Sequence, residues 1–264
     1  EYDSDYLHKS LANSKLDSVN IYDCTSQWGV FSIAGPNSRS FLKKIVVSED
    51  PDKTLSNKEF PWLSYRDIEI GMCPVRALRV AYTGELGWEL HHPIEMQNYL
   101  LDILLSSGKE FNLKLVGARA QNWLRQEKSY KAFGSDLGRD AGPFESKLSR
   151  FVDINKNFLG KDALLKRKTD VSCVTLLIDG PKDIDPWGRE ALYNETEEVM
   201  LGRLTSAGYS VHFKRSIGIG YVKSSFSEVG TKLRIKIDDA FWNAEIVRDS
   251  PYDPQNERII DRAQ

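Results

Sequence analysis

Tyr82-Thr83-Gly84-Glu85-Leu86-Gly87-Trp88-Glu89 is the stretch that decides the fold, because it joins two segments with strand character. Residues 75–81 lead into it and residues 88–92 lead out. Glycine permits the positive φ that tight turns need, so we predict a hairpin that brings Tyr82 and Glu89 close together. An aromatic face beside a carboxylate suits a flat heterocycle with N–H donors. An ordinary hairpin with solvated carboxylates fits the same motif, which leaves both interpretations open.

The segments on either side of this hairpin predict a mixture of strands and helices. Apolar alternation indicates strands at 19–23, 28–34 and 68–70. Gly35-Pro36-Asn37-Ser38 is typical of a helix start, and residues 48–58 predict a loop or a short capped helix. After the hairpin, helical spacing predicts a helix from Pro93 to Gly108.

A further helix is predicted from Ala118 to Phe133, ending at Gly134. Its apolar stripe includes Trp123 and Tyr130, and it also contains Glu127. A carboxylate on a stripe that faces the core needs a partner. We interpret Glu127 as one half of a structural ion pair at the edge of the core.

The pattern changes after Lys168, where short strands alternate with turn residues. The predicted strands are 171–178, 190–193, 199–210, 216–222, 231–237 and 241–247. This spacing indicates an antiparallel barrel or sandwich. This change of pattern places a border between two parts of the chain near residues 166–170.

Composition excludes several classes of function. The net charge of −2 gives no electrostatic case for nucleic acid or an anionic membrane. No apolar run reaches the length of about 18 residues that a membrane span needs. The three cysteines lack C-x-x-C spacing and the four histidines lack H-x-x-x-H spacing, so no metal site is expected. Gly218-Ile219-Gly220 lacks the third glycine of a dinucleotide fingerprint, so we expect no flavin or nicotinamide domain in this chain.

Several motifs, in one order along the chain, are shared with a known family. They are Asp23-Cys24-Thr25, residues 33–39, residues 82–90, residues 124–130, residues 158–164, residues 202–210 and Ser250-Pro251-Tyr252-Asp253-Pro254-Gln255-Asn256. In these motifs the chain resembles the folate-binding aminomethyltransferase domain of the glycine cleavage T protein. It is closer still to the C-terminal part of dimethylglycine and sarcosine dehydrogenases.

The resemblance implies an α+β fold with two domains. A truncated aminomethyltransferase core, residues 1–168, is followed by an antiparallel β-barrel domain, residues 169–264. It implies that the chain binds tetrahydrofolate while a one-carbon unit leaves a methylated amine. Carried over position by position, Tyr82, Glu89 and Tyr130 would line the folate site. Glu89 would accept hydrogen bonds from the pterin, and Tyr82 would add a flat wall or a hydroxyl.

The resemblance also implies what lies outside this chain. The family's catalytic aspartate belongs to an upstream segment, so no catalytic residue is assigned and the chain alone is expected to be inactive. FAD is expected only in a separate flavin-binding domain of a parent chain. The chain begins with Glu1, from which we expect a processed chain or a fragment. The expected compartment is the bacterial cytoplasm or the mitochondrial matrix.

Two alternatives to a demethylating dehydrogenase stay open. One is a non-catalytic regulatory or binding module, like the regulatory subunit of pyruvate dehydrogenase phosphatase. The other is a stand-alone glycine cleavage T protein. The departure at Gln121, where T proteins carry arginine, favours the dehydrogenase branch.

Overall fold

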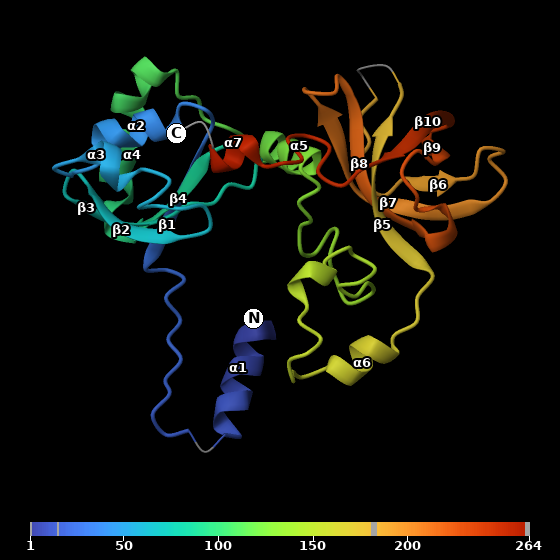
Figure 1. The fold of residues 1–264 in the computed structure, drawn as a ribbon, viewed down its shortest axis with the longest axis horizontal. Coiled ribbons are helices and arrows are strands. Elements are labelled where there is room, and N and C mark those ends of the chain that lie inside the picture. The colour runs from blue at the N-terminus through green and yellow to red at the C-terminus, as the bar shows by residue number, and fades with distance from the viewer. Residues whose placement is uncertain (1, 15, 181–183, 262–264) are drawn as a thin grey trace.

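The computed structural model describes residues 2–14, 16–180 and 184–261 (Figure 1). Helix α1 (Tyr2–Ala12) has no buried residue and is followed by an extended segment that leads to the first strand. From there the chain forms a sheet module, then irregular segments, and finally a barrel.

The sheet module is a four-stranded antiparallel sheet with helices on one face. Its strands are β1 (Trp28–Ala34), β2 (Tyr65–Ile70), β3 (Cys73–Leu78) and β4 (Gly87–Pro93), in the order β1-β4-β3-β2. Helices α2 (Ser38–Ile45) and α4 (Gln97–Gly108) cover one face, where their leucines join the core. Short helical turns complete it: α3 (Pro51–Thr54), η1 (Ile94–Met96) and η2 (Lys109–Phe111).

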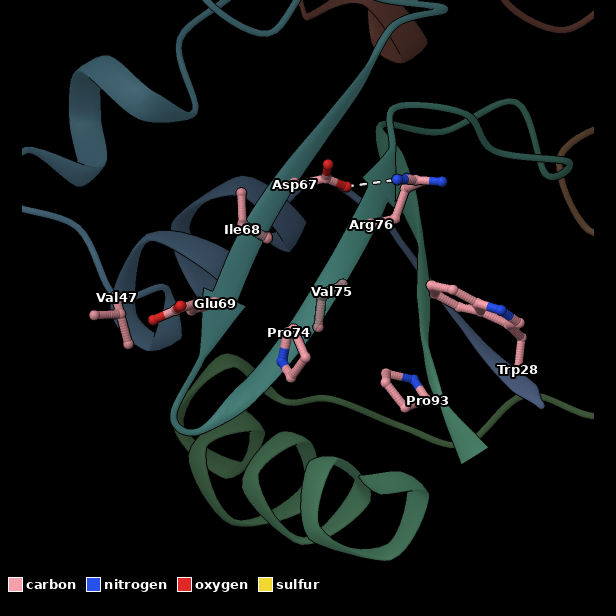
Figure 2. A pocket seen from close by; sticks show the side chains of 9 residues that line it. All are labelled: Trp28, Val47, Asp67, Ile68, Glu69, Pro74, Val75, Arg76 and Pro93. Atoms are coloured by element: carbon pink, nitrogen blue, oxygen red, sulfur yellow. Dashed lines mark hydrogen bonds and ion pairs between the residues drawn. The ribbon is translucent and has the colours of Figure 1, made fainter. Parts of the chain in front are cut away.

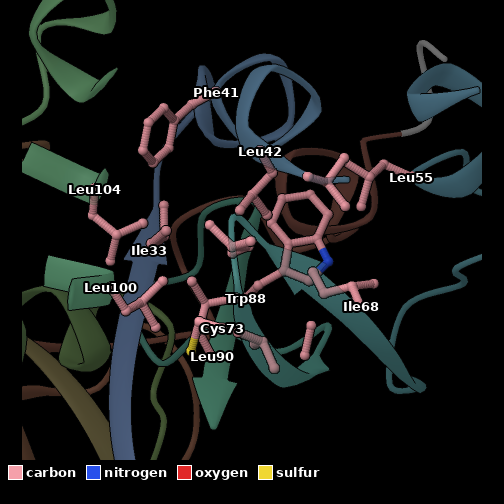
Figure 3. Close-up of a cluster of buried hydrophobic side chains, with 14 of the residues drawn as sticks. Ile33, Phe41, Leu42, Leu55, Ile68, Cys73, Trp88, Leu90, Leu100 and Leu104 are labelled. Carbon is pink, nitrogen blue, oxygen red and sulfur yellow. The ribbon is translucent and has the colours of Figure 1, made fainter. Parts of the chain in front are cut away.

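The core of this module forms between the helices and every second residue of the strands (Figure 3). Trp88 and Leu90 of β4 are fully buried, whereas Glu89 between them points to the opposite face of the sheet. The Trp88 ring also carries two buried guanidinium groups, those of Arg39 and Arg79, at 5.5 and 5.8 Å from its centroid. The alternation of side chains along β4 therefore decides which of them build the core. The others lie on the sheet face opposite α2 and α4, which we call the open face.

The barrel is closed by six antiparallel strands. They are β5 (Val171–Ile178), β6 (Ala191–Tyr193), β7 (Met200–Ser210), β8 (Arg215–Lys223), β9 (Lys232–Ile237) and β10 (Ala240–Val247), in the order β10-β5-β8-β7-β6-β9. Leucine, isoleucine and valine side chains from all six strands fill its interior. The structure thus confirms the predicted α+β fold class and resolves the choice between a barrel and a sandwich in favour of the barrel.

Between the two modules lie α5 (Ala118–Glu127), η3 (Ser149–Phe151) and α6 (Lys161–Lys166). Helix α5 packs on β7, where a Cβ atom on Gly208 would lie only 2.0 Å from the Trp123 ring. Within the barrel, η4 (Ser224–Phe226) joins β8 to β9. After the barrel, the last described helix is α7 (Glu257–Ile260), which lies beside the sheet module. The predicted border between residues 168 and 169 stays a prediction; it falls in the segment between α6 and β5.

Two predicted elements are wrong. Residues 19–23 form no strand, and no strand of the described residues pairs with them, so their alternation has no sheet to join. The predicted helix 118–133 ends at Glu127, because Ser129 has a φ of +54° that breaks the helical path. By contrast, Gly218 and Gly220 lie in β8, crowded against β7, which confirms that they are not a dinucleotide-binding turn.

Candidate functional site

The predicted tight hairpin is instead a wide loop, residues 79–86, between β3 and β4. In the paired part of the two strands Leu78 lies opposite Glu89, so Tyr82 belongs to the loop rather than to the ladder. Gly84 has the expected positive φ of +78°, but Gly87 lies inside β4. A Cβ atom on Gly87 would lie 2.6 Å from the carbonyl oxygen of Ile33, so close approach of β1 explains this glycine.

The structure brings two of the three predicted site residues together. The rings of Tyr82 and Tyr130 are stacked, with centroids 5.9 Å apart and planes 21° from parallel. Tyr82 is 36% exposed and Tyr130 is partly buried, so the pair forms part of an accessible surface. Burial raises the pKa of both phenols, and the Arg125 guanidinium partly offsets this for Tyr82. Both hydroxyls are therefore neutral donors at physiological pH.

A buried ion pair holds the backbone at Tyr130. The Arg125 side chain donates to the carbonyl oxygen of Tyr130 at 2.7 Å and to Asp136 at 2.6 Å. Asp136 is fully buried and also accepts from the hydroxyls of Thr205 and Ser206 on β7. Since every charge of this network has partners, it fastens the tyrosine pair to the barrel wall.

Glu89 lies in β4, on the open face of the sheet. Its side chain is 37% exposed, and its Oε2 atom lies 3.1 Å from Nε2 of His91. Of the interactions that the structure describes, none joins Glu89 to Tyr82. The carboxylate therefore has free lone pairs for an added donor.

The same open face of the sheet has a hollow (Figure 2). The hollow has a volume of about 490 Å³ and includes Trp28, Asp67, Arg76 and Pro93. Arg76 lies opposite His91 in the sheet and donates to Asp67 at 3.0 Å, so a charged pair and an indole border the hollow. An aromatic wall beside paired charges can bind a flat polar molecule.

A second cavity, of about 600 Å³, lies on the helix side of β1. Leucines of α4 and the residues 111–116 line it together with Thr83, Glu85 and Leu124. The Thr83 hydroxyl is buried and has no partner among the described atoms. The loop that carries Tyr82 therefore borders a mainly apolar cavity with its other side.

Glu127 does not form the predicted ion pair. Its carboxylate is 3% exposed and accepts from the Ser210 hydroxyl and from the backbone N–H of His212. No ion pair of Glu127 occurs in the part of the chain that the structure describes. Because α5 packs on β7 and β8, neutral donors of the barrel provide the hydrogen bonds that the buried Glu127 carboxylate needs.

The sequence motifs did not identify four residues that contact the segments carrying Tyr82 and Tyr130, namely Arg125, Lys128, Asp136 and Tyr252. Lys128 is buried beneath Gly84, and the Tyr252 hydroxyl donates to Glu85. The signal was available in part, because charged residues interrupt the apolar stripe of α5 and Tyr252 lies in a shared motif. Their partners, however, are far away in the sequence.

Neither a metal site nor a membrane-spanning helix occurs among the described residues. Residues 2–14, 16–180 and 184–261 contain no group of three His, Cys, Asp or Glu side chains arranged to hold a metal ion. Within the same ranges no helix has the length and apolarity to cross a membrane.

Comparison with known families explains the arrangement of two modules. Residues 1–156 match the family model of the GCVT N-terminal domain, and residues 172–253 match that of the glycine cleavage T-protein C-terminal barrel domain. The chain belongs to the glycine cleavage T-protein family. Within this family the barrel strands β5 to β10 fall in the segment that matches the barrel model.

Relatives within the T-protein family include large dehydrogenases and smaller transferases. Dimethylglycine dehydrogenase from Mus musculus mitochondria is 36% identical over 238 residues, which are 88% of this chain and 26% of that protein. An aminomethyltransferase from Caldanaerobacter subterraneus is 29% identical, over 90% of this chain and 62% of that protein. Sarcosine dehydrogenase from Mus musculus mitochondria is 28% identical over 90% of this chain. The chain spans about a quarter of the length of the dehydrogenases it matches.

A solved structure has the same fold. The glycine cleavage system aminomethyltransferase T from Bartonella henselae superimposes with a TM-score of 0.72 and 20% identity, covering 86% of this chain and 60% of that one. At this identity the similarity shows the fold of the T-protein family and no more.

Proposed function

We propose that this chain is the tetrahydrofolate-binding, one-carbon transfer portion of a demethylating enzyme like dimethylglycine or sarcosine dehydrogenase. Family membership and 36% identity to a dimethylglycine dehydrogenase support the enzyme class. The stacked pair of Tyr82 and Tyr130 is the observation that carries the proposed ligand. Two parallel phenol rings from separate segments, one of them accessible, offer a wall for a flat heterocycle.

The residues present fit a reduced pterin. Glu89 has one described partner, His91, and its exposed carboxylate keeps capacity to accept from amino and ring N–H groups. A charge-assisted pair of such bonds is stronger than bonds between neutral groups. Tyr82 and Tyr130 would enclose the ligand and donate from their neutral hydroxyls. Tetrahydrofolate, when bound, supplies the nitrogen atoms that take up the one-carbon unit.

The remaining components of the proposed reaction are assigned to a longer parent protein. They are a flavin-binding domain with FAD, the methylated amine that it oxidises, and the aspartate of the upstream segment. This chain contributes binding and exclusion of water, because a free imine would hydrolyse to formaldehyde. A stand-alone aminomethyltransferase is the second candidate, favoured by the match that covers 62% of such an enzyme.

Titration of the full-length protein with a reduced folate, followed by tryptophan fluorescence, tests the proposal. We compare wild type with Glu89→Gln and use Glu245→Gln as the control, because Glu245 is an exposed strand carboxylate that lines neither of the two cavities described above. Losing a hydrogen bond to a charged group costs about 1.5–3 kcal/mol, so the Kd for folate should rise by about tenfold or more in Glu89→Gln alone.

Equal Kd values for wild type and Glu89→Gln would rule out the role assigned to Glu89. Absence of folate binding in the wild type would reject the enzyme interpretation and favour a regulatory or binding module. Release of a transferable one-carbon unit without flavin reduction would favour the stand-alone transferase.

A further inference from the structure

The C-terminal segment after β10, residues 248–261, returns from the barrel to the sheet module, and we call it the C-terminal strap (Figure 1). Its end is anchored in the sheet module by two buried arginines. Arg79 donates to the carbonyl oxygen of Ile260 at 2.6 Å, and Arg39 pairs with the Asp261 carboxylate at 3.0 Å. Because both guanidinium groups also lie against Trp88, the strap is tied to the module's core.

The middle of the strap is bonded to the residues that follow α5. The backbone N–H of Tyr252 donates to the carbonyl oxygen of Glu127 at 3.0 Å. The backbone N–H of Ser250 donates to the Ser129 hydroxyl at 2.9 Å. These bonds hold Ser129 in its left-handed conformation, immediately before Tyr130.

Lys128 connects the strap to the loop that carries Tyr82. Its side chain is fully buried, and its ammonium donates to the carbonyl oxygen of Asp253 at 2.7 Å and to Oδ1 of Asn256 at 2.8 Å. Its aliphatic stem runs beneath Gly84, where an added Cβ atom would lie 2.3 Å from Cγ of Lys128. Burial lowers the pKa of Lys128, and the nearby Asp253 opposes this shift.

A second contact ties the same loop to the strap. The Tyr252 hydroxyl donates to the Glu85 carboxylate, and Arg258 lies 3.6 Å from the same oxygen. Tyr82 is two residues before Gly84, and Tyr130 is two residues after Lys128. Both halves of the stacked pair are thus fixed through Lys128 and the strap rather than through each other alone.

We propose that Lys128 is a positioning residue of the folate site, and that an ordered C-terminal strap is required for the spacing of Tyr82 and Tyr130 that binds the pterin. The identity of the ligand rests on the proposed function, whereas the effect of Lys128 and the strap on the spacing of the two tyrosines does not depend on any ligand. A stacking wall binds tightly only when it is held in place before the ligand arrives.

The experiment uses Asn256→Gly, which removes one of the two acceptors of the Lys128 ammonium while keeping a backbone whose φ is +58°. Gln255→Ala, an exposed change on the same strap, is the matched control. Lys128→Met is the second variant, because it keeps a long stem beneath Gly84 without the ammonium. In the full-length protein we measure the Kd for 5-formyltetrahydrofolate and the ¹⁹F spectrum after 3-fluorotyrosine labelling, with Tyr82→Phe and Tyr130→Phe to assign the two signals.

We expect Asn256→Gly and Lys128→Met to raise the Kd about tenfold, the scale seen for residues that act through others. We expect the signals of Tyr82 and Tyr130 to shift in these variants and to stay unchanged in Gln255→Ala. Unchanged signals, with only a lower melting temperature, would overturn the inference and leave Lys128 a purely structural residue. Shifted signals in a protein that binds no folate would instead reject the proposed function and keep the positioning role.

Discussion

The buried pair of Arg125 and Asp136 provides a quantitative test of how the tyrosine pair is fastened to the barrel. In Asp136→Asn the side chain keeps its shape but loses its charge. The hydroxyls of Thr205 and Ser206 can rotate to face the new amide, so their bonds can be kept. The loss is therefore concentrated at the guanidinium, which remains 3% exposed without an opposing charge.

Removing one partner of a buried ion pair costs about 3–5 kcal/mol. A change of 1 kcal/mol shifts the melting temperature of a chain of this size by about 2–4 °C, so Asp136→Asn should lower it by about 6–20 °C. Asp179→Asn is the control, since Asp179 pairs with Arg215 at 2.7 Å but is 59% exposed. An exposed pair of this kind contributes at most about 1 kcal/mol.

The assay is thermal unfolding followed by circular dichroism, with urea unfolding at one temperature as a second measure of the free energy. The reasoning predicts a large loss for Asp136→Asn and almost none for Asp179→Asn. Equal midpoints for the two variants would refute it, because the burial of Asp136 would then have no energetic consequence.

Two further predictions concern packing and pH. Gly208→Ala should lower the free energy of unfolding by about 1–3 kcal/mol, because its Cβ atom would lie 2.0 Å from the Trp123 ring. The control is Gly138→Ala, whose Cβ atom meets no atom within 4 Å and which should leave the stability unchanged. Equal urea midpoints for the two variants would contradict the packing of α5 on β7. Burial raises the pKa of the Cys173 thiol from 9.0 to about 12, so its contribution to stability is complete below pH 9.0 and is lost as the pH rises towards 12. The stability of wild type relative to Cys173→Val should therefore fall by about 1.4 kcal/mol per pH unit above that point. A difference that does not change with pH would show that Cys173 titrates normally.

The barrel could be predicted from the sequence because its signals are local. The strand predicted at 171–178 coincides with β5, and the other five predicted strands agree with β6 to β10 within two residues at each end. Apolar alternation and turn residues are patterns within a few neighbouring residues, so the strands can be recognised without knowledge of distant contacts.

The end of α5 could not be predicted, because distant residues decide it. The helical spacing of Trp123, Glu127 and Tyr130 continues past Glu127. The strap bonds to Ser129, however, and buries Lys128, which ends the helix early. The acceptor role of Glu127 likewise depends on Ser210, which lies on β7. Tertiary contacts overrode the local pattern at both places.

The geometry of the candidate site could not be predicted from the sequence. Tyr82 and Tyr130 lie together in the structure, and their role, like that of Glu89, stays a prediction. In the register of β3 and β4, Glu89 lies opposite Leu78, so Tyr82 belongs to the loop and not to the paired strands. The sequence motif at residues 82–89 does not fix the register of β3 and β4, because loops of different lengths could join the two strands.

The most direct test of the account is an experimental structure of the full-length protein with a reduced folate bound. The account predicts a pterin ring that contacts the tyrosine pair and places its N–H edge within hydrogen-bond distance of the Glu89 carboxylate. A folate bound elsewhere, with Glu89 still paired only to His91, would contradict it.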